Sequence, residues 1–394
     1  MIPAHKRQVA FILNKVTDIV ISPSSLVSLH VQVHNQLRQH ILSEHWPNGT
    51  RIPSESELVE HLRVSRSTIR LALQQAEIEG LIERIAGRGT FVVYKPTTDH
   101  GNRVIAFVTC DFDSEGQLIV LNSIESEAKA RGYQVVFSKA QSRQEELNIL
   151  NTFQEKNAGI VLWSNMSDLS QSDGLVYRQF RIPIVLMDRT IEGFTCDCVT
   201  SDNYGGASTL LQHLIELGHR DIALVSHNMM EISSVRDRYR AYKDVLRDNG
   251  LTPVAPWIVG LPGKEMGFRR TLRASIDTQS LEIQQIKDQM LNAHPRPTAI
   301  FAINDLLAIL TMRTMKLLNL AVPEAISIAG FDDLDLAAHL DVPLTTVAQD
   351  AYLLGKTAAQ ILIDRIEGHA GPVNYQVIPT QMRIRSSTAL PVRA

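Results

Sequence analysis

Residues 53–94 read PSESELVEHLRVSRSTIRLALQQAEIEGLIERIAGRGTFVVY, and they decide the fold of the front of the chain. Ser54 stands before an apolar run and Glu57 follows three residues later, which is the spacing of a capping box at a helix start. Ser65 can begin a second helix, which Gly80 ends. The apolar positions of that helix recur at helical spacing and are Ile69, Ala72, Leu73 and Ala76. A short helix, a three-residue turn and a second helix predict a helix-turn-helix motif.

A β-hairpin is predicted directly after this motif. Residues 81–85 and 90–94 have strand composition, and Ala86-Gly-Arg-Gly89 forms a tight turn between them. Upstream, a helical stripe can pack behind the motif, formed by Val33, Leu37 and Ile41. The front of the chain is therefore expected to be a small α+β winged helix-turn-helix domain.

Residues 27–95 resemble the DNA-binding domain of the GntR family. The pieces P-S-E-x-E-L, V-S-R-x-T-I-R and G-x-G-T-F-V stand in the family's order and spacing. The resemblance implies DNA contacts at Ser56, Ser65, Arg66, Ser67, Thr68, Arg70, Gly87 and Arg88. Arginine can bond guanine bidentately in the major groove, and hydroxyls and backbone N–H groups at a helix start suit phosphates. A solvated helix face is the alternative reading of the exposed arginines.

A second module is expected to follow a turn-rich linker at 96–102. Apolar segments of strand length alternate with amphipathic helices. The strand segments are residues 103–109, 133–138, 158–163, 182–187, 221–226, 298–303 and 325–330. This alternation predicts parallel sheets covered by helices. Because residues 103–394 are too many for one such domain, two α/β lobes are expected. Residues 1–26 are left as an N-terminal extension.

Polar side chains gather where these strands are predicted to end, which is where open α/β sheets bind ligands. The region resembles the effector domain of the lac/gal repressor family, itself similar to periplasmic sugar-binding proteins, through pieces such as VTSDNYGGA, PTAIFAIND and VPEAISIAGFDD. The resemblance implies an effector site that includes Arg238, Asn304 and Asp332, with weaker candidates in Phe112, Trp163 and Arg189. Other roles stay open: Asn304 can cap a helix, Asp332 can form a turn, and Arg238 can join a salt bridge between lobes.

Composition excludes several other classes of protein. The net charge of −3 rules out a basic nucleic-acid coat, although residues 1–95 are net positive. No apolar run is long enough to cross a membrane, and the N-terminus lacks the pattern of a signal peptide. Three cysteines without a C-x-x-C pattern indicate neither a disulfide framework nor a metal site, and they suit a cytoplasmic location. With no P-loop or other catalytic motif, neither enzymatic activity nor a cofactor is expected.

The two resemblances together predict a DNA-binding transcriptional regulator, a repressor, controlled by a sugar-like effector. The pairing of modules is similar to the arabinose repressors of the AraR type. The resemblance also implies a homodimer, and a two-fold pair reads an inverted repeat in its operator. The alternative is a sugar-binding protein of the transport type, which the winged helix and the lack of a signal peptide disfavour. The sequence does not identify the effector.

Overall fold

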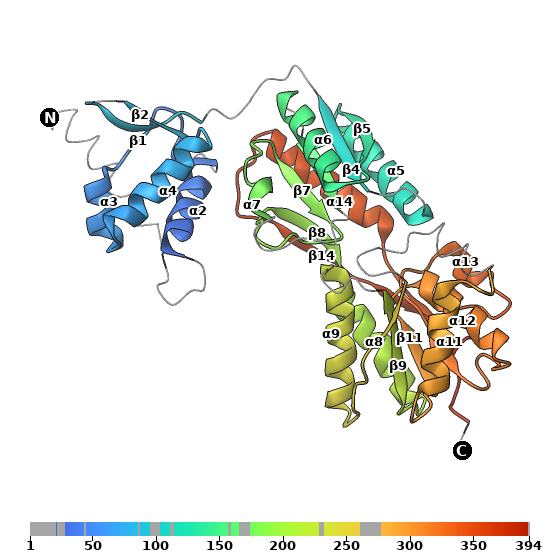
Figure 1. Cartoon of the computed structure of the whole chain (residues 1–394). Helices are drawn as coiled ribbons and strands as arrows, with labels where there is room; N and C mark the ends of the chain where they lie inside the picture. The colour runs from blue at the N-terminus through green and yellow to red at the C-terminus, as the bar shows by residue number, and fades with distance from the viewer. Residues whose placement is uncertain are drawn as a thin grey trace. The chain divides into compact units, whose positions relative to one another are not determined.

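The computed structural model describes residues 21, 28–42, 45–85, 87–94, 103–110, 114–156, 159–164, 174–227, 232–260 and 277–392. The chain divides into two compact units, and both can be followed by colour in Figure 1. The first unit comprises residues 1–100 and 364–372, and the second comprises residues 101–363 and 373–394. No helix among the described residues is both long and apolar enough to span a bilayer.

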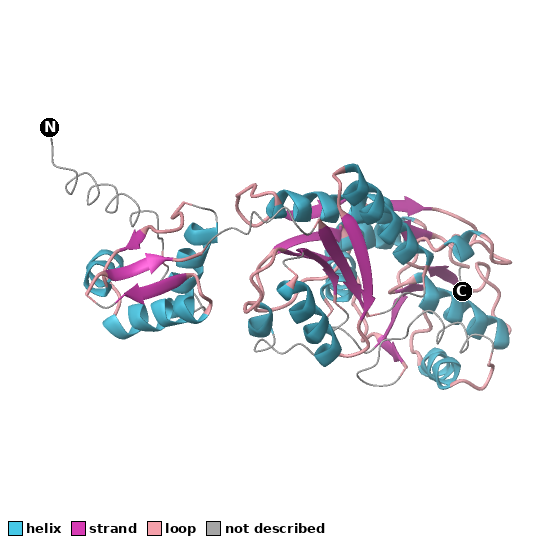
Figure 2. Cartoon of the chain, turned by 90° about the horizontal axis from the view of Figure 1, so that it is seen from above, coloured by secondary structure: helices cyan, strands magenta, loops and turns pink. Residues whose placement is uncertain are grey.

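The first unit is a winged helix-turn-helix domain. Its helices are α2 (Leu29–Leu42), α3 (Glu55–Leu62) and α4 (Arg66–Ile78). Its strands are β1 (Arg51–Ile52), β2 (Ile82–Ile85) and β3 (Gly89–Val92), which form an antiparallel sheet of order β1-β3-β2. Figure 2 shows this sheet lying against the helices. The predicted stripe of α2 is confirmed, because Val33, Leu37 and Ile41 are buried in one core with Ile69 and Leu73 of α4.

Local hydrogen bonds fix the two helix starts of the motif as the sequence predicts. The hydroxyl of Ser54 accepts from the Glu57 N–H at 3.3 Å, while the Ser54 N–H donates to the Glu57 carboxylate at 2.6 Å. Ser65 caps α4 by accepting from the Thr68 N–H at 3.1 Å. Arg63 ends α3 in the left-handed region, with φ 53°, and this reversal directs the chain into α4.

The second unit begins with an α/β lobe, here named the N-terminal lobe. Its sheet is wholly parallel, in the order β14-β8-β7-β6-β4-β5. The strands in that order are Tyr375–Ile378, Asp197–Ser201, Ile184–Met187, Gly159–Trp163, Val104–Thr109 and Gln134–Lys139. On one face, Ala106 and Val108 pack against helix α6 (Arg143–Glu155) and against α7 (Gly174–Tyr177). Helices α5 (Glu115–Ala130) and α14 (Ala351–Ile366) touch so closely that only glycine fits at Gly355, beside Ser123.

A second parallel sheet, of order β10-β9-β11-β12, forms the C-terminal lobe. Its strands in that order are Trp257–Val259, Ile222–His227, Ala299–Ala302 and Ser327–Ala329. The helices are α8 (Asn203–Glu216), α9 (Ser233–Asp248), α11 (Leu281–Asn292), α12 (Asp305–Leu317) and α13 (Asp335–Ala338). Most strand interiors are fully buried, as expected of parallel strands covered on both faces. The predicted α/β lobes are therefore confirmed.

The chain passes between the two lobes three times. The first passage runs from β8 into α8, the second from β13 (Thr346–Ala348) into α14, and the third from β14 to β15 (Gln381–Arg383). Two of these passages are tied together, since the Asp202 N–H donates to the Ile378 carbonyl at 2.8 Å. A side chain at Gly206 would meet Thr380, Val347 and Phe331, so the backbone at this junction is packed closely. Connections of this kind are where a hinge between the two lobes would lie.

Candidate functional sites

The outward face of α4 carries the predicted DNA-contacting residues. Arg66 and Arg70 lie one turn apart, and their side chains are 64% and 63% exposed. At the helix start the Ser65 hydroxyl lies 2.7 Å from that of Ser67 and 2.8 Å from that of Thr68. The structure therefore brings five predicted residues together on one helix, with hydroxyls and free N–H groups at its positive end.

Glu55 binds the arginines of this face. Its carboxylate lies 3.7 Å from the Arg66 guanidinium, 3.6 Å from that of Arg70 and 3.7 Å from that of Arg84 on β2. Ser56, which is also predicted to contact DNA, accepts a 3.0 Å hydrogen bond from Arg66. Glu55 was not a predicted site residue, because a carboxylate in a DNA-contacting face has no signature in sequence.

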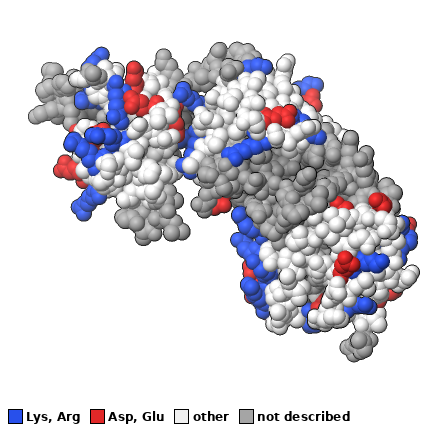
Figure 3. Space-filling model, in the orientation of Figure 1, with Lys and Arg blue, Asp and Glu red and all other residues white. Residues whose placement is uncertain are grey.

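The hairpin of β2 and β3 presents the predicted wing. Gly87 and Gly89 have φ of 72° and 113°, in the region that favours glycine. Arg88 is exposed between them, and its N–H donates to the Ile85 carbonyl at 3.0 Å, which closes the turn. A side chain at Gly89 would meet the Arg51 guanidinium at 2.8 Å. Two arginines therefore lie at the wing, and Figure 3 shows the Lys and Arg side chains on the visible face of this unit.

Arg238 lies at the centre of the second predicted site, on the first turns of α9. It donates to the Asn203 side-chain oxygen at 2.8 Å and to the Ile303 carbonyl at 2.7 Å. Its guanidinium also forms an ion pair with Asp332 at 3.2 Å and stacks over the Phe331 ring, with 3.7 Å to the centroid. Because both charges belong to the C-terminal lobe, this salt bridge holds one lobe together and does not bridge the two.

Asp332, which pairs with Arg238, and Asp305 both have raised pKa values. Asp332 has φ 120°, and it accepts from the Gln349 side chain at 2.8 Å. Burial raises the pKa of Asp332 to about 6, although Arg238 acts in the opposite direction. Asp305 is fully buried, and it accepts from the Thr346 hydroxyl and from the Leu334 N–H. Burial, together with the charge of Asp332, raises the pKa of Asp305 to about 7.

Asn304 has the capping role that the sequence left open. Its side-chain oxygen accepts from the Leu307 N–H at 2.9 Å and begins α12. The oxygen keeps a second lone pair, and the amide NH₂ is a further group through which Asn304 can reach a ligand.

The predicted residues of the N-terminal lobe lie at strand ends of its sheet. Arg189 follows β7, and its guanidinium pairs with Asp188 at 3.1 Å. The next residue reaches the other lobe, since the Thr190 N–H donates to the Ser233 hydroxyl at 2.9 Å. Trp163 is the last residue of β6 and is half-buried. Phe112 lies outside the described residues.

The sequence indicated Ser201 and Asn203 at this site only within the polar segment Ser201-Asp202-Asn203 at a helix start, and it did not indicate Gln349. Asn203 orients Arg238, as described above. The Ser201 hydroxyl and the side-chain oxygen of Gln349 are buried, and neither has a hydrogen-bond partner among the described residues. Such orphaned polar atoms are costly in a protein interior and point to a missing partner. Within VAQD, nothing in the local spacing marked Gln349.

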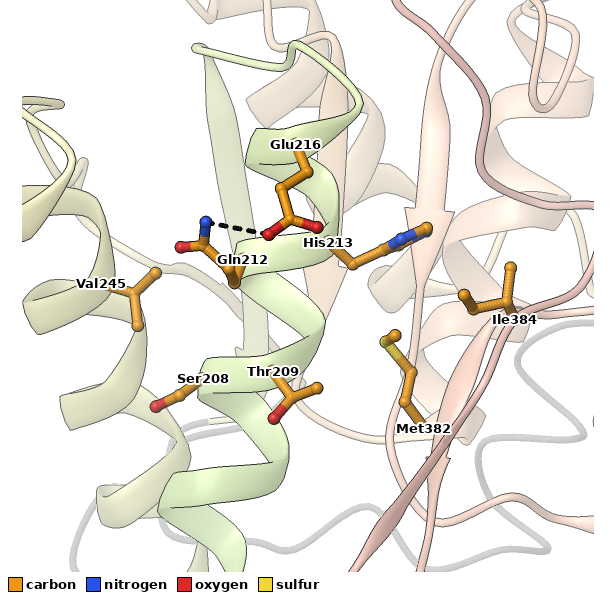
Figure 4. A pocket seen from close by; sticks show the side chains of 8 residues that line it. All are labelled: Ser208, Thr209, Gln212, His213, Glu216, Val245, Met382 and Ile384. Atoms are coloured by element: carbon orange, nitrogen blue, oxygen red, sulfur yellow. Dashed lines mark hydrogen bonds between the residues drawn. The ribbon is translucent and has the colours of Figure 1, made fainter.

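A separate groove of about 510 Å³ lies along the outward face of α8 (Figure 4). Its lining residues are Ser208, Thr209, Gln212, His213, Glu216, Val245, Met382 and Ile384. None of the predicted effector residues lines it, so it is distinct from the site around Arg238. Among the described residues, no group of three or more His, Cys, Asp or Glu side chains could hold a metal ion.

Comparison with known proteins identifies both units. Residues 29–92 match the bacterial regulatory proteins of the gntR family, and residues 211–388 match the periplasmic binding protein-like domain. The chain is 27% identical to the arabinose metabolism transcriptional repressor of Geobacillus stearothermophilus, over 91% of this chain and 97% of that repressor. It is 28% identical to the ribose operon repressor of Bacillus subtilis, over 62% of this chain and 68% of that protein.

Solved structures share the fold of the second unit. A LacI-family transcriptional regulator from Enterococcus faecium with bound ribose has a TM-score of 0.58 at 24% identity, and covers 74% of this chain and 100% of its own. A periplasmic binding protein/LacI transcriptional regulator from Alkaliphilus metalliredigens, in complex with D-xylulofuranose, has a TM-score of 0.59 at 22% identity. The match covers 73% of this chain and 99% of that chain. The chain therefore joins a gntR-type winged helix-turn-helix domain to a periplasmic-binding-protein-like domain, whose fold these solved structures share.

Proposed function

We propose that this protein is a transcriptional regulator, a repressor, which binds operator DNA through its first unit and a sugar-like effector through its second. The observation that carries the proposal is the presence in one chain of an exposed, capped arginine helix with a Gly-Arg-Gly wing and of a polar site around the Arg238–Asp332 pair of an α/β lobe. Similarity to an arabinose repressor over 91% of the chain supports it.

In this proposal the first unit reads DNA with α4. Arg66 and Arg70 bond base edges in the major groove, where arginine recognises guanine. The start of α4, with the hydroxyls of Ser65, Ser67 and Thr68, binds phosphates. Ser56 positions Arg66, and the wing residues Gly87 and Arg88 contact the backbone beside the groove. The domain boundaries proposed for this arrangement are 27–95 for the DNA-binding domain, 96–102 for a linker and 103–394 for the sensor.

The proposed effector is a neutral compound with several hydroxyl groups. Arg238, Asp332 and the amide of Asn304 offer donors and an acceptor for such hydroxyls, and the ring of Trp163 can cover an apolar sugar face. Arg238 is paired with Asp332, and Arg189 is paired with Asp188. Because these described arginines already have carboxylate partners, a phosphorylated sugar fits less well than a neutral one. Phe112 stays in the proposal on the family resemblance alone.

Effector binding is proposed to act through lobe closure. A ligand that contacts both lobes favours the closed state by its differential affinity, and closure can alter the spacing of two DNA-binding domains in a dimer. The proposal includes a homodimer and an operator with inverted repeats, because one small winged helix offers few base contacts. A protein that acts on operator DNA is placed in the cytoplasm.

The proposal excludes two other roles. A transport protein does not need the capped arginine helix and wing of the first unit. For catalysis, the relatives offer no support, since they are transcriptional regulators. Incubation of the protein with neutral pentoses and hexoses, followed by chromatography of the sugar, is expected to yield no product.

The experiment that tests the proposal is a titration of DNA with the full chain in the presence and absence of sugars. A duplex enriched from a random library by the protein serves as the operator, and a thermal-shift screen of pentoses, hexoses and their phosphates selects the ligand. We expect one neutral sugar to raise the melting temperature and to weaken operator binding. Failure to enrich any sequence would contradict the DNA-binding role, and a response only to phosphorylated sugars would contradict the effector class.

A further inference from the structure

Leu71 is an apolar side chain on the otherwise polar DNA-facing half of α4. It follows Arg70 directly, and 51% of it is exposed. Single exposed leucines are common on protein surfaces and need no explanation by themselves. The position of this one on the helix does call for an explanation, because it lies among the residues proposed to enter the groove.

Helix geometry places Leu71 near the centre of the outward face. The buried side chains of α4 define the inward direction and are Ile69, Ala72, Leu73 and Ala76. At about 100° per residue, Ser67 lies within about 10° of the opposite direction and Leu71 within about 30°. Leu71 is also one turn beyond Ser67, so the two side chains are neighbours.

The arginines occupy one flank of the same face. Arg66 and Arg70 are both drawn toward α3 by the Glu55 carboxylate, at 3.7 Å and 3.6 Å. The apolar cluster of this unit lies on the opposite side of α4, and Leu71 is not among its members in the described residues. Ser67 and Leu71 therefore form the middle of the outward face, between the arginines and the C-terminal half of the helix.

The N-terminal half of a recognition helix contacts base edges in the major groove. Donors and acceptors there are matched by arginine, serine and similar side chains, whereas the C5 methyl group of thymine is the apolar feature of the groove. We propose that Leu71 packs against the C5 methyl of a thymine in the operator, and so specifies a T·A pair next to the base pair read by Arg70. This inference rests on the proposed DNA-binding function.

Replacement of thymine by uracil removes only the methyl group, and this makes the contact testable. The operator is the duplex enriched from a random library by the full chain, with uracil introduced at one thymine position of both half-sites at a time. For the natural protein, we expect one position at which uracil weakens binding about fourfold per half-site, which corresponds to about 0.8 kcal/mol for one buried methyl group. Leu71→Ala should bind the thymine duplex more weakly and be indifferent to uracil at that position.

Two variants serve as controls. Leu71→Met keeps an apolar side chain of similar volume, so the uracil penalty should remain. Ile78→Ala removes another exposed apolar side chain of α4, 67% exposed and two turns further on, and should also leave the penalty unchanged. Circular dichroism melts should show that each variant is folded.

The inference is overturned if no thymine position shows a penalty with the natural protein, if the enriched sequence holds no thymine in its half-sites, or if Leu71→Ala shows the same penalty as the natural protein. If the natural protein enriches no sequence at all, the proposed DNA-binding function itself fails, which is a distinguishable result.

Discussion

Glu55 shows how single residues shape the proposed DNA-reading face. A carboxylate among arginines repels phosphates, yet it also restrains three long side chains that would otherwise lose conformational freedom on binding. Arg66 has a second restraint in the hydroxyl of Ser56. The arginines are therefore held in place before DNA arrives, an arrangement that favours geometrically specific base contacts over loose binding to phosphates.

Replacement of Arg66 or Arg70 by alanine is expected to weaken specific operator binding by about 1–3 kcal/mol each, the cost of a lost bidentate base contact. Both side chains are well exposed, so the fold should persist. Arg88→Ala should cost less, because the wing contacts the backbone. The measurement is operator titration at several salt concentrations, where a lost base contact leaves the salt dependence nearly unchanged and a lost phosphate contact reduces its slope. Natural affinity in both helix variants would exclude α4 as the reading helix.

We expect Asp305 to make the stability of the second unit depend on pH. Its pKa is raised from about 3.8 to about 7, so the folded state binds a proton that the unfolded state releases over this range. Stability should therefore fall as pH rises, by about 2–3 kcal/mol between pH 5 and pH 7 at about 1.4 kcal/mol per pKa unit, and level off above. Asp332, with a pKa raised to about 6, contributes in the same direction.

Asp305→Asn should flatten this dependence. An asparagine oxygen can still accept from the Leu334 N–H, and its NH₂ can donate to the Thr346 hydroxyl, so the neutral side chain suits the site. Denaturant unfolding from pH 5 to pH 8 measures the effect. Asp341→Asn is the matched control. Because Asp341 is 92% exposed, its replacement should leave the dependence of stability on pH as it is in the natural protein. Equal profiles for all three proteins would show that Asp305 does not titrate in this range.

Among the elements, α4 illustrates what local sequence can predict. Its cap, its buried stripe and its end are all determined within 15 residues, so the pattern and the structure agree. Strands β8, β10, β13, β14 and β15 were not predicted. Some of their pairings join distant parts of the chain, since β14 pairs with β8 across more than 170 residues. The roles of Asn203 and Gln349 were hidden for the same reason. Each contacts a side chain on another element, and no local spacing records such a contact.

The start of α4 should respond differently to two substitutions at Ser65. Ser65→Ala removes the cap on the Thr68 N–H and should destabilise the helix start by about 1 kcal/mol. Ser65→Asp can keep the cap and favours the helix dipole, so stability should be restored. Its negative charge, however, would meet phosphates, so operator binding should weaken further than in Ser65→Ala. Hydrogen exchange at the amides of Ser67–Ile69 reports stability, and DNA titration reports binding. Equal DNA affinity of the two variants would place this helix start away from phosphates.

At the scale of the whole molecule, regulation requires a conformational equilibrium that both the effector and the operator DNA shift when they bind. The lobes are suited to this, since three passages connect them and the Arg238 network lies beside the passage from β8 into α8. The hydrogen bond that Gln349 donates to Asp332 ties the proposed effector site to a second passage, because Gln349 follows β13. A ligand that replaces these contacts would act on the hinge directly.

Arg238→Ala and Asp332→Ala are therefore expected to abolish the effector response while leaving operator affinity close to that of the natural protein, because neither residue lies in the first unit. For the natural protein the coupling between the two ligands should be about 1–3 kcal/mol, and by linkage operator DNA must change effector affinity by the same factor as effector changes DNA affinity. Both directions can be measured, by DNA titration with and without sugar and by calorimetry of the sugar with and without DNA. Arg240→Ala is the matched control, since Arg240 lies on the same helix with 57% of its side chain exposed. A full response in both variants, Arg238→Ala and Asp332→Ala, would place the effector elsewhere. Unequal factors in the two directions would show that the two measurements do not report a single coupled equilibrium.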